Sequence, residues 1–180
     1  MTVYADPIER NIYAFASYTS DFFERTGHTP NMLTTYSVMF KVMTVLTLWY
    51  NKLLAFCVLY FVSYIFDCMD GFMARKYKMY SVIGDMYDHI SDNVTYLAII
   101  LIVIYKLRSR KKPLAILLIA TTILGALQIT HLACISKQKK DDDVKSVIDQ
   151  INGLCIESNP FGTGMFSLAM PIMIAYTLHI

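Results

Sequence analysis

The chain is poor in the features that mark disulfide-bonded, zinc-binding and nucleic-acid-binding proteins. It has four cysteines in 180 residues, and none of them are spaced as CxxC. Most of them lie within or beside apolar runs, where a free thiol behaves as a small hydrophobic side chain. We therefore expect neither disulfides nor a zinc site. The formal net charge of +2 is too small, and the Lys and Arg residues are too dispersed, for a protein that binds DNA or RNA.

Other common features are also missing. The first residues, MTVYADPIERN, carry acids where a secretory signal has its hydrophobic part, so we expect no cleavable signal peptide. The sequence has no internal repeat and no low-complexity tract. It also lacks the paired DDxxD motifs that polyprenyl-diphosphate enzymes use to bind metal and diphosphate.

Apolar residues are what the chain has in abundance. They make up 56% of the sequence, and the mean hydropathy is +0.44, which would leave a soluble domain with large apolar areas in water. Runs of membrane-spanning length occur at about residues 31–50, 52–74, 84–105, 113–135 and 161–180. The sequence predicts an all-α, polytopic transmembrane helix bundle of about five to six spans.

Residues 6–26 have a different pattern. Asp6 can cap a helix, Pro7 suits its first position, and Glu9 stands where a capping box has an acid. Apolar residues then recur at helical intervals, which predicts an amphipathic helix lying on the membrane surface. A soluble cap on the bundle is the alternative. We thus divide the chain into an interfacial helix and linker (1–30) and a transmembrane domain (31–180).

The Lys and Arg residues predict an orientation. More of them lie on the side that holds the N-terminus, the turn after Arg75 and the polar segment 136–160 than on the other side. The KLRSRKK run opposes this assignment. By the positive-inside rule, the turn after Arg75 faces the cytoplasm.

Carboxylates crowd around that turn. Asp67 and Asp70 share one helical stripe, and Asp88 and Asp92 share another, with a short turn between the two helices. Carboxylates that converge beside lipid repel one another unless cations neutralise them. Because Mg2+ and Mn2+ prefer oxygen ligands, the pattern predicts a divalent metal site, with two ions matching the charge.

Small residues and one cation accompany the carboxylates. Gly71, Ala74 and Gly84 leave a gap in which the phosphates or ring of a ligand can approach the backbone. Arg75, together with the metals, suits a pyrophosphate, which needs positive charge on several oxygens.

The complete stretch, FDCMDGFMARKYKMYSVIGDMYDHISD, has the spacing DxxDGxxARx8GxxxDxxxD. It resembles the signature of the CDP-alcohol phosphatidyltransferases, membrane enzymes that make phospholipids by displacing CMP from a CDP-linked alcohol. TPNMLT, which includes Asn31, also resembles the entry of that family into its first span.

The resemblance implies roles for individual residues. Asp67, Asp70, Asp88 and Asp92 would bind two Mg2+ or Mn2+ ions, and Asp92 would also be the general base. Asn31, Gly71, Ala74 and Gly84 would line the CDP pocket. Arg75 would support that pocket by a phosphate contact or a structural ion pair.

The resemblance also implies three partners: a CDP-alcohol donor, an alcohol acceptor and the lipid bilayer. It leaves a homodimer open. Members usually have six spans, whereas five can be counted here, and Asn93 follows the last aspartate where bacterial-type members often have a basic residue. Adjacent Asp88 and His89 resemble the choline and ethanolamine phosphotransferases, while the length resembles the phosphatidylinositol and phosphatidylglycerophosphate synthases. The acceptor therefore stays open.

Three further alternatives also stay open. His131 and Lys137 could face an anionic acceptor, although Lys137 also suits an interface anchor. A cation transporter would place aspartates at the membrane as well, but along a path through the bilayer rather than at one end. A catalytically inactive relative would keep the same fold.

Overall fold

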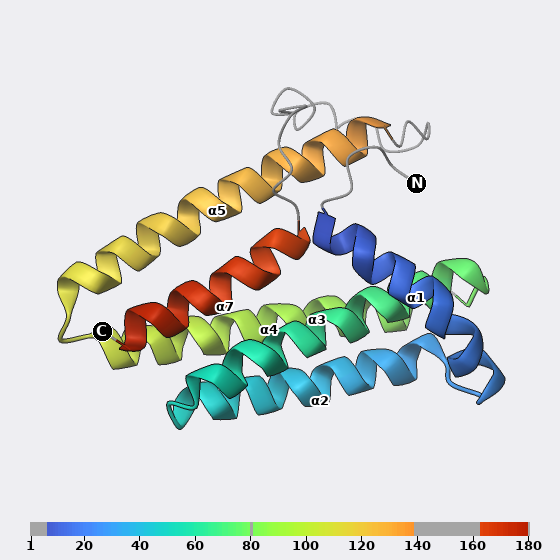
Figure 1. Cartoon of the computed structure of the whole chain (residues 1–180), viewed down its shortest axis with the longest axis horizontal. Helices are drawn as coiled ribbons and strands as arrows, with labels where there is room; N and C mark the ends of the chain where they lie inside the picture. The colour runs from blue at the N-terminus through green and yellow to red at the C-terminus, as the bar shows by residue number, and fades with distance from the viewer. Residues whose placement is uncertain (1–6, 80, 139–162, 180) are drawn as a thin grey trace.

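The computed structural model describes residues 7–79, 81–138 and 163–179 (Figure 1). All regular structure in these residues is helical, as the sequence predicted. The helices are α1 (Pro7–Arg25), α2 (Pro30–Trp49), α3 (Leu53–Lys76), α4 (Val82–Leu107), α5 (Lys111–Gln138) and α7 (Thr163–His179). Each expected apolar run coincides with a helix to within about three residues, since such runs leave few polar side chains to compete for backbone hydrogen bonds.

Three of the described helices are long and apolar enough to cross a membrane. They are Pro30–Trp49, Leu53–Lys76 and Met86–Leu107, the last lying within α4. The apolar stretch Lys112–Leu127 of α5 is shorter, and α7 has 17 residues. Together these helices indicate a multi-pass membrane protein, while a total of five spans stays a prediction.

Tight turns make the first helices antiparallel. Gly27 has a φ of +78° between α1 and α2, a value that a residue without a Cβ adopts at no steric cost. Asn51 turns the chain between α2 and α3 with a φ of 57°. Ser81 caps α4 by accepting a hydrogen bond of 3.3 Å from the backbone N–H of Gly84. These turns bring α2, α3 and α4 together.

Helix α2 is the common neighbour of α3 and α4. Among the described residues, it contacts each of them more extensively than they contact each other. A core of Leu48, Phe56, Ile99 and Leu107 fills the end near the α2–α3 turn, where α7 adds Met170. Toward the other end, polar side chains of α2, α3 and α4 lie together.

Helix α1 packs against α3 near that polar end. Ile12 and Ala16 are buried in the contact, whereas Phe15, Tyr18 and Phe22 are exposed. The single apolar face that the sequence predicted is therefore divided between a side that packs on the bundle and a side that faces outward. That the outward side contacts lipid stays a prediction.

Candidate active site

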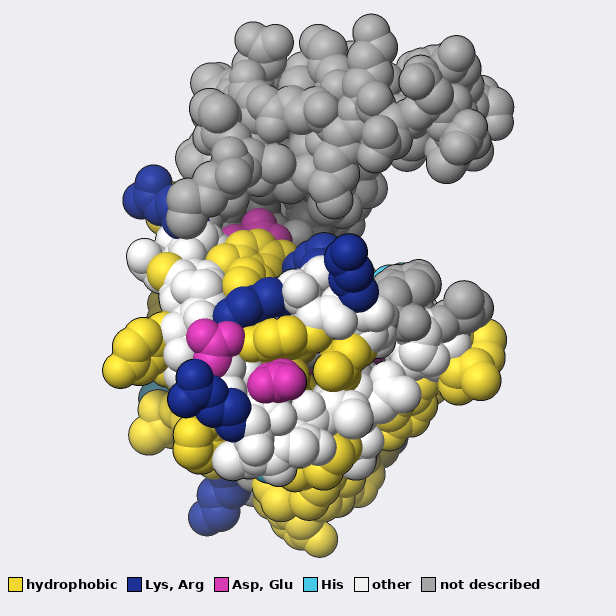
Figure 2. Space-filling model, turned by 90° about the vertical axis from the view of Figure 1, so that its right-hand side faces the viewer, with side chains coloured by type: hydrophobic (Ala, Val, Ile, Leu, Met, Phe, Trp, Pro, Cys, Tyr) yellow, Lys and Arg dark blue, Asp and Glu magenta, His cyan; other side chains and the backbone are white. Residues whose placement is uncertain are grey.

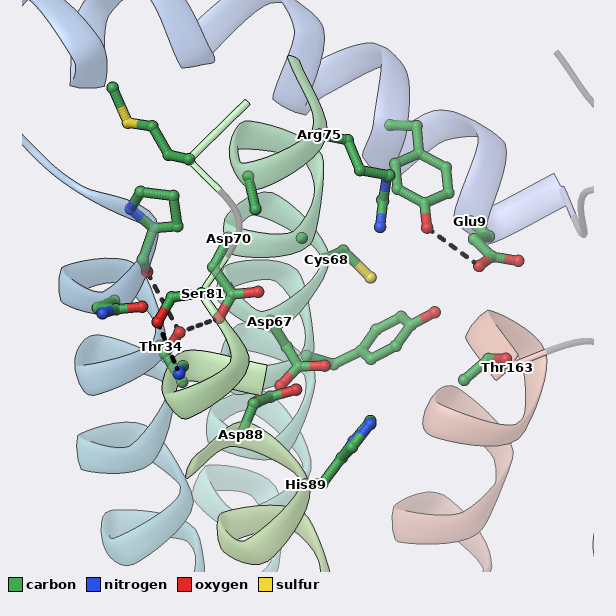
Figure 3. A pocket seen from close by; sticks show the side chains of 18 residues that line it. Glu9, Thr34, Asp67, Cys68, Asp70, Arg75, Ser81, Asp88, His89 and Thr163 are labelled. Carbon is green, nitrogen blue, oxygen red and sulfur yellow. Dashed lines mark hydrogen bonds between the residues drawn. The ribbon is translucent and has the colours of Figure 1, made fainter. Parts of the chain in front are cut away.

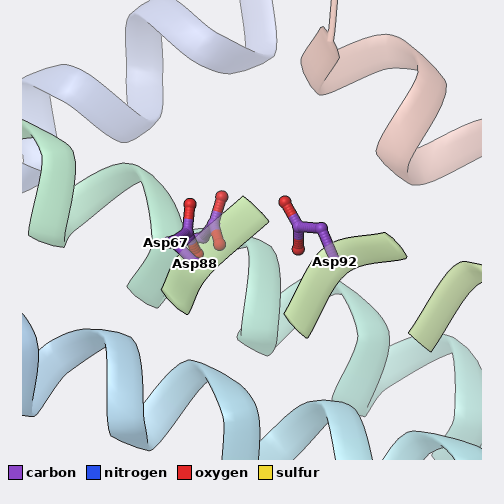
Figure 4. A group of neighbouring side chains, drawn as sticks. All are labelled: Asp67, Asp88 and Asp92. Carbon is purple, nitrogen blue, oxygen red and sulfur yellow. The ribbon is translucent and has the colours of Figure 1, made fainter. Parts of the chain in front are cut away.

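Three carboxylates from two helices form a compact group. Asp67 belongs to α3, and Asp88 and Asp92 belong to α4. One ligand oxygen from each lies within 4.8 Å of the other two (Figure 4). Asp88 and Asp92 share a face because they are one helical turn apart. The three carboxylates are thus close enough to share one cation.

A lysine from α2 reaches into this group. Lys41 Nζ lies 2.9 Å from Asp67 Oδ1, 2.5 Å from Asp92 Oδ1 and 3.6 Å from Asp88 Oδ1. It also donates a hydrogen bond of 3.3 Å to Ser91 Oγ. The Lys41 side chain is only 7% exposed. The sequence analysis did not single out Lys41, although a lysine inside an apolar helix indicates a buried partner.

The donor set fits a divalent cation. It consists of carboxylate oxygens, which are the ligands that Mg2+ and Mn2+ favour. Asp88 Oδ1 is buried, and no hydrogen bond to it is present in the described part of the chain. Lys41 Nζ lies 3.6 Å from this oxygen, which is too far for a hydrogen bond, so the oxygen can still accept a further ligand. The three carboxylates could therefore hold a metal ion.

Asp70, the fourth predicted ligand, lies apart from this group. Its Oδ2 accepts a hydrogen bond of 2.5 Å from Thr34 Oγ1 of α2, and both residues are buried. Asp70 follows Asp67 by almost one turn of α3, so it lies further toward the α3–α4 turn. The structure brings three of the four predicted carboxylates together and places the fourth on the adjoining cavity wall.

A cavity of about 380 Å³ adjoins the carboxylates. Figure 3 shows Asp67, Asp70 and Asp88 on one side of it, with Arg75 and Glu9 above them in this view. The residues for which the sequence predicted CDP binding all line this cavity: Asn31, Gly71, Ala74, Arg75 and Gly84. Asp92 is not among the lining residues; it lies beyond Asp88 with its side chain 49% exposed.

Gly71 and Gly84 leave space that neighbouring side chains occupy. A Cβ on Gly84 would collide with Asn31 Oδ1, and one on Gly71 would lie 3.3 Å from Arg75 Nη1. A larger residue at either position would therefore move a side chain that lines the cavity. Gly84 thereby leaves room for the Asn31 side chain between α2 and α4.

Helix α1 also contributes to the cavity, which sequence reasoning missed. Glu9 and Tyr13 line it, and the Tyr13 hydroxyl donates a hydrogen bond of 3.5 Å to Glu9 Oε1. Burial and the charge of Glu9 raise the pKa of Tyr13 to about 12, so the phenol keeps its proton at neutral pH. The Arg75 guanidinium carbon lies 5.9 Å from the centre of the Tyr13 ring. The capping-box pattern marks Glu9 as a helix-start residue and not as part of a site, and no motif marks Tyr13.

Three other residues that the sequence singled out have different outcomes. His89 lines the cavity beside Asp88. The side chains of His131 and Lys137 lie outside the described residues, and their proposed contact with the acceptor stays a prediction.

Comparison with known proteins assigns the chain to a family. A family model described as CDP-alcohol phosphatidyltransferase matches residues 27–179, a range that holds every helix from α2 to α7 and the carboxylate group. Comparisons with curated proteins and with solved structures gave no match. Because the family model covers most of the sequence, the chain belongs to the CDP-alcohol phosphatidyltransferases, a family of enzymes that transfer substituted phosphate groups in phospholipid synthesis.

Proposed function

We propose that the protein transfers a phosphatidyl group from CDP-diacylglycerol to an alcohol acceptor and releases CMP. The observation that carries this proposal is the position of the carboxylate group. One carboxylate oxygen from each of Asp67, Asp88 and Asp92 lies within 4.8 Å of the other two, close enough to bind one metal ion. Two of these residues, Asp67 and Asp88, also line the cavity. A carboxylate group that could hold a metal and a cavity thus adjoin, which supports chemistry on a diphosphate.

In this proposal, Asp67, Asp70, Asp88 and Asp92 hold two Mg2+ or Mn2+ ions. Bound divalent cations supply positive charge to the pyrophosphate of the donor and so stabilise CMP as a leaving group. Asp70 differs from the other three because Thr34 fixes it by a hydrogen bond. That bond would keep the carboxylate directed at the cavity before any ion binds.

The cavity holds the CDP part of the donor. A nucleotide can approach the cavity wall closely where it is formed by Asn31, Gly71, Ala74 and Gly84. Arg75 supplies a fixed positive charge at the same wall. Tyr13 and Glu9 of α1 close the opposite side. Such a wall orients the pyrophosphate for attack from one direction.

Asp92 is the general base. The acceptor oxygen forms a bond to the phosphorus distal to cytidine, while the bond from that phosphorus to the bridging oxygen breaks and CMP leaves with the electron pair. The proton of the acceptor hydroxyl passes to the Asp92 carboxylate. The partial exposure of Asp92 supports this role, because an acceptor can approach it from outside the cavity.

We place this reaction at the cytoplasmic face of a bundle of five spans. Lys, Arg, Asp and Glu side chains gather on the end of the molecule that carries the α1–α2 and α3–α4 turns (Figure 2). Charged side chains favour the aqueous side of a bilayer. A homodimer is compatible with this arrangement.

The test is CMP release by the full chain in membranes containing CDP-diacylglycerol and Mg2+ or Mn2+. Inositol, glycerol 3-phosphate and serine are supplied in turn as acceptors. We expect metal-dependent turnover with one of them and its loss in Asp92→Asn. Metal-independent turnover, or full activity in Asp92→Asn, would exclude the mechanism.

One observation favours a second donor. His89 lines the cavity directly after Asp88, and this adjacent pair resembles the choline and ethanolamine phosphotransferases. The same assay therefore includes CDP-choline and CDP-ethanolamine with diacylglycerol as acceptor. Turnover only with CDP-choline or CDP-ethanolamine would show that one of these, and not CDP-diacylglycerol, is the donor.

A further inference from the structure

The carboxylate group already contains a cation. The Lys41 ammonium contacts all three of its members, at 2.9 Å from Asp67, 2.5 Å from Asp92 and 3.6 Å from Asp88. The three ligand oxygens lie within 4.8 Å of one another, so the ammonium lies at the centre of the group. A metal ion shared by the same oxygens would need that position.

Lys41 has little freedom to lie elsewhere. Its side chain is 7% exposed, and it arises from the middle of a helix that is apolar enough to span a membrane. A charged amine there is costly unless it is paired. Ser91 Oγ, at 3.3 Å, is its other described partner. The carboxylates thus hold the lysine in place, and the lysine neutralises part of their charge.

Binding an ammonium and a divalent cation to the same three carboxylates at once is energetically unfavourable. Their like charges repel strongly at such short distances in a partly buried site. Asp70 is different, because its hydrogen-bond partner is the neutral hydroxyl of Thr34. The conflict is therefore confined to Asp67, Asp88 and Asp92.

We propose that Lys41 is a built-in counter-cation that competes with divalent metal for Asp67, Asp88 and Asp92. In the metal-free protein the ammonium holds these three carboxylates together. Metal binding at the group displaces the ammonium from its centre. Lys41 is thus a positioning residue that lowers metal affinity and stabilises the empty site. This inference rests on the proposed metal site.

The test is Mn2+ binding to the purified full chain in detergent, measured by electron paramagnetic resonance of the free ion. Lys41→Met and Lys41→Gln remove the charge and keep most of the side-chain volume. We expect both variants to bind Mn2+ about tenfold or more tightly than the parent chain. Lys41→Arg, which keeps the charge, should not gain affinity.

Lys106→Met is the matched control. Lys106 is a lysine of α4 that donates hydrogen bonds to Trp49 O and Asn51 Oδ1, at the end of the helix away from the carboxylates. Its loss should leave Mn2+ affinity unchanged. Mn2+ affinity that rises equally in this control would contradict a local effect of Lys41.

Thermal unfolding gives a second readout. In EDTA, Lys41→Met and Lys41→Gln should unfold at a lower temperature than the parent, because three carboxylates then lose their counter-charge. Added Mn2+ should raise their unfolding temperature by more than it raises that of the parent.

The outcomes separate this inference from the proposed function. Tighter Mn2+ binding in either charge-removing variant supports competition, even if the other variant does not fold or the parent binds no Mn2+. Unchanged or weaker binding overturns it, while metal-dependent CMP release by the parent would leave the proposed function standing. If no chain binds Mn2+, the competition is overturned, and the proposed function fails as well only if CMP release is also independent of Mg2+ and Mn2+.

Discussion

Thr34 Oγ1 donates a hydrogen bond of 2.5 Å to Asp70 Oδ2, which links α2 to α3 inside the cavity. Both residues are buried. The same hydroxyl lies 3.2 Å from the backbone carbonyl of Pro30, in the first turn of α2. The bond therefore fixes the direction of a carboxylate and the register of two helices at once.

Replacing Thr34 by Val should destabilise the protein. The valine removes the hydroxyl at nearly constant volume and leaves the buried Asp70 carboxylate without this donor, which should lower the free energy of unfolding by about 1–3 kcal/mol. Denaturant unfolding in detergent measures the change. Thr34→Ser keeps the hydroxyl and should retain most of the stability. Equal stability of the Val variant and the parent would show that the bond contributes nothing.

Replacing Asp92 by Asn should remove the general base, because a neutral amide takes the place of the negatively charged carboxylate. We expect the rate of CMP release to fall by about 10²–10⁴-fold. Glu24→Gln is the control, because Glu24 is an exposed acid on α1 and should tolerate the same chemical change without loss. Activity that falls equally in both variants would indicate a general effect of charge.

Gly84→Ala should impair donor binding. The added Cβ would displace the Asn31 side chain from the cavity wall, and a displacement of this size can lower kcat/KM by up to about a hundredfold. We expect the donor KM to change more than kcat. Gly125→Ala is the matched control, since a Cβ there has nothing within 4 Å. A Gly84→Ala enzyme with parental KM would mean that Asn31 does not contact the donor.

Chelation should abolish turnover reversibly. EDTA removes the ions that Asp67, Asp70, Asp88 and Asp92 are proposed to hold, and the charge on the leaving group is then not neutralised. We expect CMP release to stop and to recover on addition of Mg2+ or Mn2+. Sustained release in EDTA would be incompatible with a metal-dependent transferase.

The contact between α1 and α3 should weaken in acid. A hydrogen bond from Lys76 to Asp21, at 2.5 Å, and a second from Tyr77 lower the pKa of Asp21 below its ordinary value of 3.8. A lowered folded-state pKa means that the stabilisation is complete above pH 3.8 and is lost as the pH falls through the lower folded value.

Amide hydrogen exchange in α1 measures this effect. Protection should decrease as the pH falls below 3.8, after correction for the intrinsic exchange rate. Asp21→Asn should show weaker protection at neutral pH and no such pH dependence. The same acid sensitivity in Asp21→Asn would assign it to another group.

Much of the fold followed from local pattern. Apolar runs of spanning length predicted the helices, and Gly27 and Asn51 lie where the chain turns. The spacing of the four aspartates predicted that all of them converge, because helical periodicity and a short turn place the two acidic stripes opposite each other. Asp67, Asp88 and Asp92 do so, whereas Asp70 is hydrogen-bonded to Thr34 instead. The small residues near them predicted a cavity for the same reason. In each case the interacting residues are close together in the chain.

Only the tertiary structure revealed that Lys41 and Thr34 of α2 and Glu9 and Tyr13 of α1 belong to the site. The contribution of α2 expected from the sequence was Asn31 alone. Lys41 reaches Asp67 across 26 residues of sequence, and Thr34 reaches Asp70 across 36. Helix α2 is apolar on most sides, so its pattern does not show which face meets α3 and α4. That choice depends on the packing of the whole bundle. The sequence by itself determined an acidic site flanked by small residues. Packing decided that a lysine lies within it, because a buried ammonium needs carboxylates that only the assembled helices bring together.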